Sequence, residues 1–368
     1  MKVECIRESV RNALMSLERV TGKNLSLPIL SGVHISASKK NNTISLQATN
    51  LDLGMEISLP AKIEEEGDII VPPGVVIGIL SGVFDKKIEM AVAQGNLSLS
   101  SVNTSSLVKG IQGEEFPTLP VVQGGVELTL PSKTLVEGVK SVWYSASLSD
   151  IKPEISSVHI SIQNDIVVFV STDSFRLAEK KINASRVNEE AELLLPYKNI
   201  TEIMRIFEGV SGEVKILCNK NQASFFAGGT YVTSRVIDGI FPDYNQIIPK
   251  NHQTSVTALK QDFMNILKVA NIFADKSNRI EIIADPKEKL FEIRSHNANI
   301  GENTSRIDAT LEGEKISLGF NHKYLLDCLP SIKQESIVLH FAGQGKPLIL
   351  QGKGDKSFLY LVMPLTPQ

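Results

Sequence analysis

The residues that could do chemistry are scattered along this chain. Its six histidines stand at positions 34, 159, 252, 296, 322 and 340, without the HExxH, HxH or CxxH spacing that gathers metal ligands. Three cysteines, Cys5, Cys218 and Cys328, share no CxxC spacing, so we expect buried, reduced thiols. The sequence has no GxGxxG after a strand, no GxxxxGK[ST] and no GxSxG. We therefore predict no metal site, no cofactor and no catalytic residue.

One tract, STDSFRLA at 171–178, could be an enzyme loop in which Asp173 and Arg176 act as an acid and an anion-binding group. Its relatives elsewhere in the chain, ATNLDLGM and SHNANIGE, lack both groups at the matching positions, which argues against a shared active site. The tract instead has apolar neighbours beside polar ends, a pattern typical of peptide-binding sites. Those neighbours are Phe175, Leu177, Pro242 and Ile247, and taken one at a time each could equally belong to an ordinary core.

The elements that must position these residues repeat three times. Three strand-like segments end in matched positions at Thr49, Thr172 and His296, spaced by 123 and 124 residues. A strand then runs into a helix at Pro72, Pro196 and Phe320, spaced by 124 residues each time. A hydrophobic residue before proline closes each copy, at Phe116-Pro117, Phe241-Pro242 and, more loosely, Met363-Pro364. The period predicts three domains, at 1–122, 123–251 and 252–368.

Each copy is predicted to be α+β, with two helices and roughly eight short strands. Residues 8–21 place Val10, Leu14, Leu17 and Val20 on one helical face, and 131–146 and 259–274 are its counterparts. The second helices begin near Pro72, Pro196 and Phe320. The acidic run at 64–66, followed by Gly67-Asp68, predicts a solvated turn.

Composition limits the class of protein. A chain of 368 residues with 42% hydrophobic and 21% charged residues builds two or three soluble globular domains. Its longest nearly apolar run, 74–84, is about half of the roughly 20 residues that cross a bilayer. The N-terminus has charges where a signal peptide would be apolar, so we expect a cytoplasmic protein that does not bind membranes.

The net charge of −3 argues at first against binding to nucleic acid. The six predicted helices nevertheless sum to +4, which leaves −7 for the rest of the chain. The helices could therefore present one basic surface. Equally, lysine and arginine could simply favour exposed helix faces.

Four segments carry a resemblance to a known family: STDSFRLA (171–178), SRVIDGIFPDYNQIIPK (234–250), LPILSGVHI (27–35) and YLVMPL (360–365). They resemble the bacterial DNA polymerase III beta subunits, the replicative sliding clamps, and the resemblance covers the whole chain. It implies a non-enzymatic processivity factor. Three clamp domains, each of two helices plus antiparallel sheets, would join head-to-tail in a homodimer that forms a six-domain ring around duplex DNA.

Simple geometry agrees that two chains are needed for such a ring. Six helices packed about 10 Å apart give an axis radius of about 10 Å, which leaves no room for DNA. Twelve helices give an opening of about 28 Å, wide enough for a duplex about 20 Å across. The ring would then slide without sequence preference, because attraction to the backbone through water is easily exchanged.

The resemblance also implies partners and site residues. The partners are double-stranded DNA, the DNA polymerase III alpha subunit, the clamp-loader delta subunit, and other polymerases, ligase and mismatch-repair proteins that carry clamp-binding motifs. Their peptides would bind in a cleft between the second and third domains, with Thr172 and Arg176 fixing the polar part. The residues of that cleft are Ile155, Thr172, Ser174, Phe175, Arg176, Leu177, Pro242, Ile247, Pro347, Leu361 and Met363.

The resemblance places the dimer interface at Ser106 and Val108 of one chain against Ile272 and Phe273 of the other. DNA would be contacted at Lys23, Asn24, Lys152, Lys198 and Arg205. The chain departs from the family at Phe175, Gln246, Asn24, Gly74, Ser149, Ser106, Asn96 and Asn103, so peptide preference, attraction to DNA and the dimer edge are expected to differ. Two alternatives stay open: a clamp-like partner scaffold that does not encircle DNA, and a repeat-built α+β enzyme.

Overall fold

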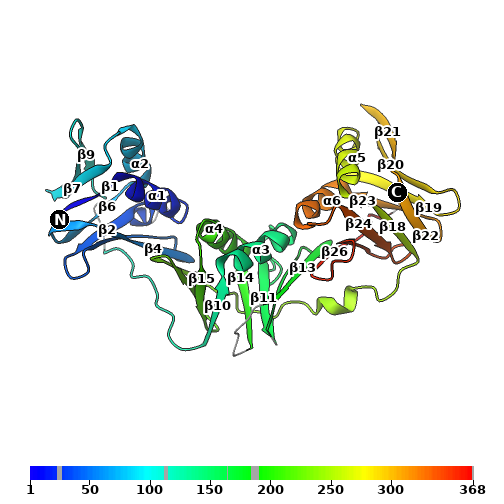
Figure 1. The fold of residues 1–368 in the computed structure, drawn as a ribbon, viewed down its shortest axis with the longest axis horizontal. Helices are drawn as coiled ribbons and strands as arrows, with labels where there is room; N and C mark the ends of the chain where they lie inside the picture. The colour runs from blue at the N-terminus through cyan, green and yellow to red at the C-terminus, as the bar shows by residue number, and fades with distance from the viewer. Residues whose placement is uncertain (23–26, 112–114, 164, 184–189, 367–368) are drawn as a thin grey trace. The chain divides into compact units, whose positions relative to one another are not determined.

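A computed structural model describes residues 1–22, 27–111, 115–163, 165–183 and 190–366. The chain folds into two compact units (Figure 1). The first contains residues 1–133 and 198–236, and the second contains residues 134–197 and 237–368. Each unit is described by itself.

The order of elements repeats along the chain. The first copy contains β1 (Lys2–Ile6), α1 (Arg7–Glu18), the 3-10 helix η1 (Pro28–Ser31), β2 (Val33–Ser38), β3 (Thr43–Thr49), β4 (Leu53–Pro60), β5 (Lys62–Glu65), β6 (Gly67–Val71), α2 (Pro73–Gly82), β7 (Lys87–Ala93), β8 (Asn96–Ser100) and β9 (Ser105–Lys109). The second contains β10 (Val126–Pro131), α3 (Ser132–Val142), η2 (Trp143–Ser145), β11 (Ser157–Gln163), β12 (Ile166–Thr172), β13 (Arg176–Asn183), β14 (Ala191–Pro196), α4 (Tyr197–Phe207), β15 (Glu213–Cys218), β16 (Gln222–Ala227), β17 (Thr230–Arg235) and η3 (Tyr244–Ile247).

The third copy contains β18 (Thr254–Leu259), α5 (Lys260–Ile272), β19 (Arg279–Asp285), β20 (Leu290–Asn297), β21 (Gly301–Arg306), β22 (Ala309–Gly313), β23 (Ile316–Asn321), α6 (His322–Cys328), η4 (Leu329–Ser331), β24 (Ser336–Phe341), β25 (Leu348–Gly352) and β26 (Phe358–Val362). Within the described residues there are thus six α-helices, two in each copy. In the same described ranges, the copies have nine, eight and nine strands. The predicted α+β class with two helices per repeat is confirmed.

The sheets join strands of successive copies. In the first unit, an eight-stranded sheet has the order β10-β15-β16-β17-β4-β3-β2-β6, beside a five-stranded sheet β5-β1-β7-β8-β9. In the second unit, a nine-stranded sheet has the order β14-β11-β12-β13-β26-β25-β24-β18-β22, beside a four-stranded sheet β21-β20-β19-β23. The antiparallel pairs β4–β17 and β13–β26 are therefore the two junctions between copies. The middle copy contributes strands to both units, and the boundaries 1–122, 123–251 and 252–368 stay a prediction.

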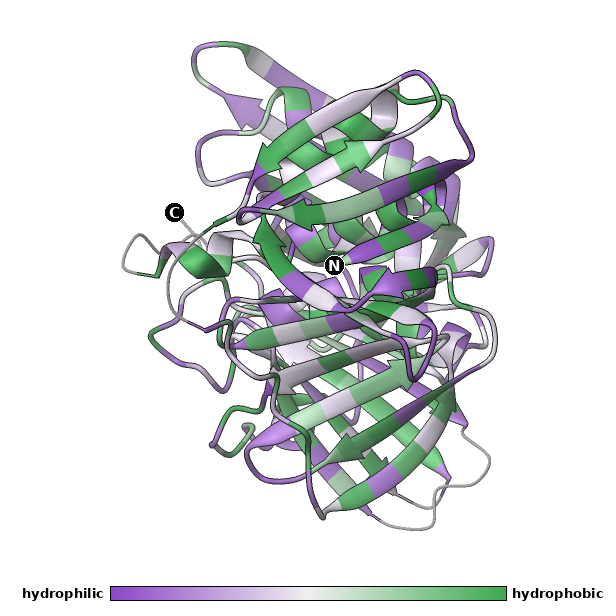
Figure 2. Ribbon diagram, turned by 90° about the vertical axis from the view of Figure 1, so that its left-hand side faces the viewer, coloured by the Kyte–Doolittle hydropathy of each residue, from purple (hydrophilic) through white to green (hydrophobic). Residues whose placement is uncertain are grey.

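The core follows the periodicity of the sequence. Helix α1 buries Val10, Ala13, Leu14 and Leu17 at three- and four-residue spacing, and Figure 2 shows hydrophobic and hydrophilic residues alternating along many strands. Helix α3 lies so close to β12 that a Cβ at Gly138 would be 2.3 Å from Phe169 Cε2. The close packing of α3 on β12 therefore leaves room only for glycine at position 138.

The prediction for the cysteines is confirmed, whereas the prediction for the acidic run at 64–66 is wrong. Cys5, Cys218 and Cys328 are free and buried, as predicted, and burial raises the pKa of the Cys5 thiol to about 12. The predicted turn at 64–66 is wrong, because Glu64 and Glu65 end strand β5. This strand lies at the edge of its sheet, where a charged side chain such as Glu64 can remain in water and pair with Lys2 at 2.8 Å.

No helix in the described part of the chain is long and apolar enough to cross a membrane.

Candidate peptide-binding site

The tract singled out from the sequence forms a tight polar turn between β12 and β13. Thr172 Oγ1 donates to the carbonyl oxygen of Arg176 at 2.7 Å and accepts from the N–H of Ser174 at 3.2 Å. Asp173 Oδ1 accepts from the N–H groups of Phe175 and Arg176 at 2.9 Å each. Ser174 has φ 75°, in the left-handed region. The turn leaves Phe175 62% exposed at its tip.

The same turn is built in the first copy. Thr49 Oγ1 donates to Leu53 O and accepts from the N–H of Leu51, both at 3.0 Å, and Leu51 has φ 78°. Asn50 Oδ1 accepts from the next N–H groups, as Asp173 Oδ1 does. The recurring small polar residues are thus backbone caps of a turn, not the remains of an active site.

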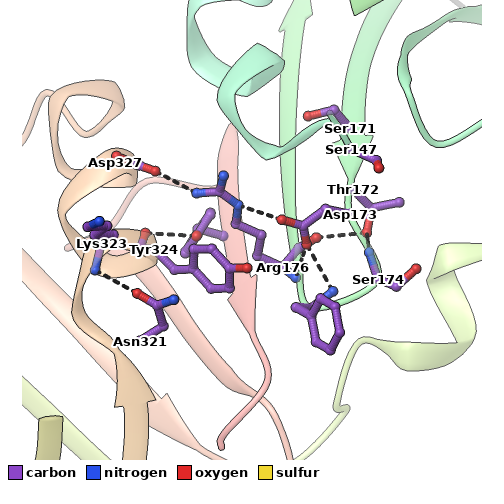
Figure 3. A network of polar contacts seen from close by, with 12 residues as sticks. Ser147, Ser171, Thr172, Asp173, Ser174, Arg176, Asn321, Lys323, Tyr324 and Asp327 are labelled. Atoms are coloured by element: carbon purple, nitrogen blue, oxygen red, sulfur yellow. Dashed lines mark hydrogen bonds and ion pairs between the residues drawn. The ribbon is translucent and has the colours of Figure 1, made fainter. Parts of the chain in front are cut away.

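Arg176 connects this turn to helix α6. Its Nε donates to Asp173 Oδ2 at 3.0 Å and its Nη1 to Asp327 Oδ2 at 2.6 Å, while the guanidinium carbon lies 4.3 Å from the ring centroid of Tyr324 (Figure 3). Burial alone lowers the pKa of Arg176, but Tyr360 and the two aspartates outweigh it and hold this pKa above its ordinary value. Thr172 and Arg176, expected to fix the polar part of a peptide, are therefore both held by protein partners.

An apolar cluster lies beside the turn. Its buried members are Val170, Leu177, Leu194, Phe241 and Leu361, and the half-buried side chains packed against them are Val168, Ile237, Tyr244, Ile248, Leu359 and Met363. Strands β13 and β26 pair Leu177 with Leu361, and the N–H of Met363 donates to Phe175 O at 2.8 Å. The fold thus brings together four of the predicted site residues: Phe175, Leu177, Leu361 and Met363.

The remaining predicted residues take different places. Pro242 and Ile247 are exposed on the segment that follows Phe241, and Ser174 is exposed on the turn. Pro347 precedes Leu348, the β25 partner of Val362, so it lies near the Met363 end of β26. Ile155 is buried and lies outside the apolar cluster. Phe241, Tyr244 and Ile248 were not predicted as site residues, because their place in the cluster depends on tertiary packing.

The junction between the first two copies has the same backbone frame. There the N–H of Arg235 donates to Asp52 O at 2.9 Å, as Met363 donates to Phe175 O at the other junction. The hydrogen-bond register therefore aligns Met363 with Arg235. The expected alignment of Met363-Pro364 with Phe241-Pro242 is wrong, because it rested on similar residue types, whereas the pairing of the strands gives a different alignment.

The side chains at the two junctions are opposite in character. At the first junction an ion pair joins Arg235 Nη1 to Asp52 Oδ1 at 3.6 Å. Gly54 takes the place that corresponds to Leu177, and a Cβ there would lie 2.7 Å from Leu119 Cδ2. Of the two junctions, the apolar one between the second and third copies is the candidate peptide-binding site.

The structure describes three of the five residues that were predicted to contact DNA. Lys152, Lys198 and Arg205 are exposed, whereas Lys23 and Asn24 lie outside the described residues. Arg205 pairs with Glu202 on α4. A groove of about 240 Å³ lies between α1 and α4. Arg19, which was not predicted to contact DNA, lines this groove. This groove brings two arginines from different copies to one surface.

The predicted dimer residues lie at or near sheet edges. Strand β9 is an edge strand in which Val108 is 4% exposed, Ser106 is half-buried and Leu107 is 67% exposed. Alternation along the strand therefore presents Leu107 outward and leaves only the backbone of Val108 at the edge. At the end of α5, Ile272 is exposed and Phe273 is half-buried, and β21 is an edge strand of its own sheet.

Five of the six histidines have contacts that the structure shows, and these contacts lie in different parts of the fold. His34 pairs with Asp68, His159 with Glu192, and His322 Nδ1 lies 3.0 Å from Asn278 O. His252 and His340 have ring centroids 4.3 Å apart. In the ranges that the structure describes, no three histidine, cysteine or acidic side chains are grouped so that they could hold a metal ion.

Comparison with known proteins agrees with this geometry. Models of the DNA polymerase III beta subunit match the chain in three parts: the N-terminal domain at residues 1–120, the central domain at 129–243 and the C-terminal domain at 245–366. Proteins named beta sliding clamp from Synechococcus elongatus and Staphylococcus aureus are 27% and 26% identical, covering 99% and 92% of both chains.

Solved structures show the same fold over the whole length. The DNA polymerase sliding clamp from Bacillus subtilis superposes with a TM-score of 0.94 at 23% identity, and the DNA polymerase III beta subunit from Thermotoga maritima with 0.93 at 23% identity. Each covers 100% of both chains. The chain belongs to the DNA polymerase III beta subunit family, the bacterial DNA sliding clamps.

Proposed function

We propose that two copies of this protein close into a ring around duplex DNA and confer processivity on the replicative DNA polymerase, without catalysing a reaction themselves. The observation that carries the proposal is the threefold repeat of a two-helix module, since twelve helices are the number that leaves room for a duplex. The protein would act in the cytoplasm and would need no cofactor.

Two edge strands support closure of the ring. Strand β9 of one protomer would pair with β21 of the other, with Leu107 and Ile272 buried near the contact and Ser106, Val108 and Phe273 beside them. Unpaired backbone groups and exposed apolar side chains favour such an association. Asn96 and Asn103, which stand where relatives often have basic residues, leave this edge with fewer charges.

The channel would be lined by helices. Arg19 and Arg205 border one groove on α1 and α4, and Lys23, Asn24, Lys152 and Lys198 would add to the surface that faces DNA. Such contacts to phosphates are independent of sequence and weaken with salt. Because Asn24, Gly74 and Ser149 replace polar or basic residues of relatives, topology rather than contact energy would retain the ring.

The apolar junction would bind the partners. The Leu and Phe anchors of a clamp-binding peptide would pack on Phe175, Pro242, Ile247 and Met363. The buried Leu177 and Leu361 would support this surface from below, with Ile155, Thr172, Ser174, Arg176 and Pro347 around it. The expected partners are the DNA polymerase III alpha subunit, the clamp-loader delta subunit, and other polymerases, ligase and mismatch-repair proteins that carry such motifs.

Retention on DNA of different topology tests the ring. After loading by a clamp loader, the protein is expected to remain on nicked circular DNA in a gel-filtration assay and to be lost once the circle is linearised. Retention on the closed circle should also persist at salt concentrations that abolish binding of the free protein to linear duplex. A protein that sediments as a monomer and never stays on circles would instead be a partner scaffold that does not encircle DNA.

A further inference from the structure

His159 is held between an acid and an aromatic ring at the edge of the apolar cluster. Its Nε2 lies 2.7 Å from Glu192 Oε1, and its ring stacks on Phe241 with centroids 4.9 Å apart and planes 10° from parallel. The His159 side chain is only 10% exposed. Burial lowers its pKa, although the hydrogen bond to Glu192 opposes this effect, so the ring that meets Phe241 at neutral pH is uncharged.

Phe241 is the anchor of the segment 237–248, which presents Pro242 and Ile247. The segment begins where the N–H of Ile237 donates to Leu194 O at 2.8 Å, and Tyr244 Oη donates to Glu179 Oε2 at 2.7 Å. Between these two points, Phe241 is 6% exposed and belongs to the apolar cluster. The stacked His159 therefore decides where the middle of this segment can lie.

The first copy repeats this arrangement within the first unit. His34 Nε2 lies 3.1 Å from Asp68 Oδ2, and the His34 ring stacks on Phe116 with centroids 5.3 Å apart and planes at 21°. The N–H of Ile111 donates to Ile70 O, the strand partner of His34, just as Ile237 donates to the strand partner of His159. The pattern of histidine, acid and stacked phenylalanine thus occurs in both the first and the second copy.

The third copy has a carboxylate at the position of this histidine. Its corresponding backbone bond runs from the N–H of Leu365 to Gly319 O, the strand partner of Glu281. Glu281 stands at the histidine position there and accepts from Ser317 Oγ at 2.5 Å. In the first two copies, by contrast, a histidine stands at this position and stacks on a phenylalanine.

We propose that His159 is a positioning residue of the peptide-binding site: its ring, oriented by Glu192, fixes Phe241 and so sets the position of Pro242 and Ile247 before a peptide binds. This inference rests on the proposed function, since it assigns a role within the same site. A preordered wall reduces the conformational entropy lost on binding, so loss of the ring should weaken the peptide without removing any contact to it.

Peptide binding by fluorescence polarisation tests this, with a fluorescein-labelled synthetic peptide that carries the Leu and Phe anchors. His159→Ala is expected to weaken binding about tenfold, corresponding to about 1.4 kcal/mol. His159→Phe, which keeps a ring against Phe241, should restore affinity to within about threefold of the unmodified protein. A purely structural role for the hydrogen bond to Glu192 would not predict that rescue.

The repeat supplies a matched control. His34→Ala removes the equivalent ring in the first copy and should leave peptide affinity unchanged. The inference is overturned if His34→Ala lowers peptide affinity as much as His159→Ala does. It is also overturned if a folded His159→Ala protein binds the peptide with unchanged affinity. Should His159→Ala fail to fold, His159→Gln, which can still reach Glu192 but has no ring, is expected to show the same tenfold loss, and normal binding by it would count against the inference.

Failure of the site and failure of this role can be told apart. Met363→Ala changes a half-buried side chain at the surface itself. If it leaves affinity unchanged, the peptide binds elsewhere and the proposed site is wrong. If Met363→Ala weakens the peptide while both His159 variants bind normally, only the positioning role is overturned.

Discussion

Arg176 shows how a residue that looks catalytic in the sequence can be structural. Its guanidinium group is shared between Asp173 and Asp327 and stacked on Tyr324, so it joins the turn to helix α6. The planar guanidinium group offers donors to both carboxylates and its flat face to the Tyr324 ring, a combination that the compact ammonium group of lysine does not reproduce.

Replacing this arginine should therefore destabilise the second unit. Arg176→Ala leaves the largely buried Asp173 carboxylate without its cation, and we expect a loss of about 2–3 kcal/mol in the free energy of unfolding by urea. Arg176→Lys should recover less than half of it. Asp327→Asn removes only the more exposed partner and should cost less. Equal midpoints for the unmodified protein and Arg176→Ala would contradict this account.

The apolar side chains beside the turn should determine how tightly a peptide binds. Met363→Ala combined with Leu177→Ala should weaken the anchor peptide at least about a hundredfold, because both support the surface on which the anchors pack. The dimer should stay intact in sedimentation. Leu177 is fully buried, so its truncation also costs stability, and Met363→Ala alone is the variant that separates the two effects. Arg235→Ala, at the equivalent position of the other junction, should bind normally.

At the scale of elements, the two junctions show that one backbone frame can carry opposite surfaces. Strand pairs β4–β17 and β13–β26 share their register and turn chemistry, yet one ends in an ion pair and the other in Phe175 and Met363. Main-chain hydrogen bonds fix the frame, and side chains are then free to differ. The chain therefore has an apolar surface at one of two equivalent frames.

Edge strand β9 carries the element-scale prediction. Leu107→Glu places a charge on the exposed face of this strand, where dimerisation would bury it, and should convert dimer to monomer in gel filtration with light scattering. Val102→Glu lies on the exposed connection just before β9 and should leave the dimer unchanged. A Leu107→Glu protein that remains dimeric would place the interface elsewhere.

At the scale of the whole molecule, three histidines of the second unit, two buried and one half-buried, predict how stability depends on pH. Burial is the main reason that the pKa values of His159, His322 and His340 lie below the ordinary 6.5. As pH falls below 6.5 the unfolded chain takes up protons first, so the free energy of unfolding falls, by up to about 1.4 kcal/mol per pH unit for each histidine.

This fall should appear as a lower urea midpoint at about pH 5.5 than at about pH 7.5. Carboxylates whose pKa is lowered, such as Glu137, titrate below 4.5 and do not contribute in this window. His340→Gln should show a smaller fall, because it removes one of the three groups. A midpoint that does not change with pH in the unmodified protein would contradict the prediction.

The sequence by itself determined the local features of this protein. The 3.6-residue period placed the first helix of each copy, and the landmarks at Pro72, Pro196 and Phe320 placed the second. Runs of Val and Ile placed many of the strands, and the spacing of Thr49, Thr172 and His296 indicated a threefold repeat. Such patterns depend on neighbours in sequence, so they can be seen without a fold. The motifs STDSFRLA and YLVMPL likewise indicated Phe175, Leu177 and Met363 as site residues.

Only the tertiary structure decided what those residues do. It committed Arg176 to Asp327, 151 positions away, turned Val108 inward and Leu107 outward, aligned Met363 with Arg235 and stacked His159 on Phe241. Each of these outcomes depends on which strands pair and in which register, and a shift of one residue reverses the face on which a side chain lies. That register is set by long-range packing and main-chain hydrogen bonds, which no local pattern contains.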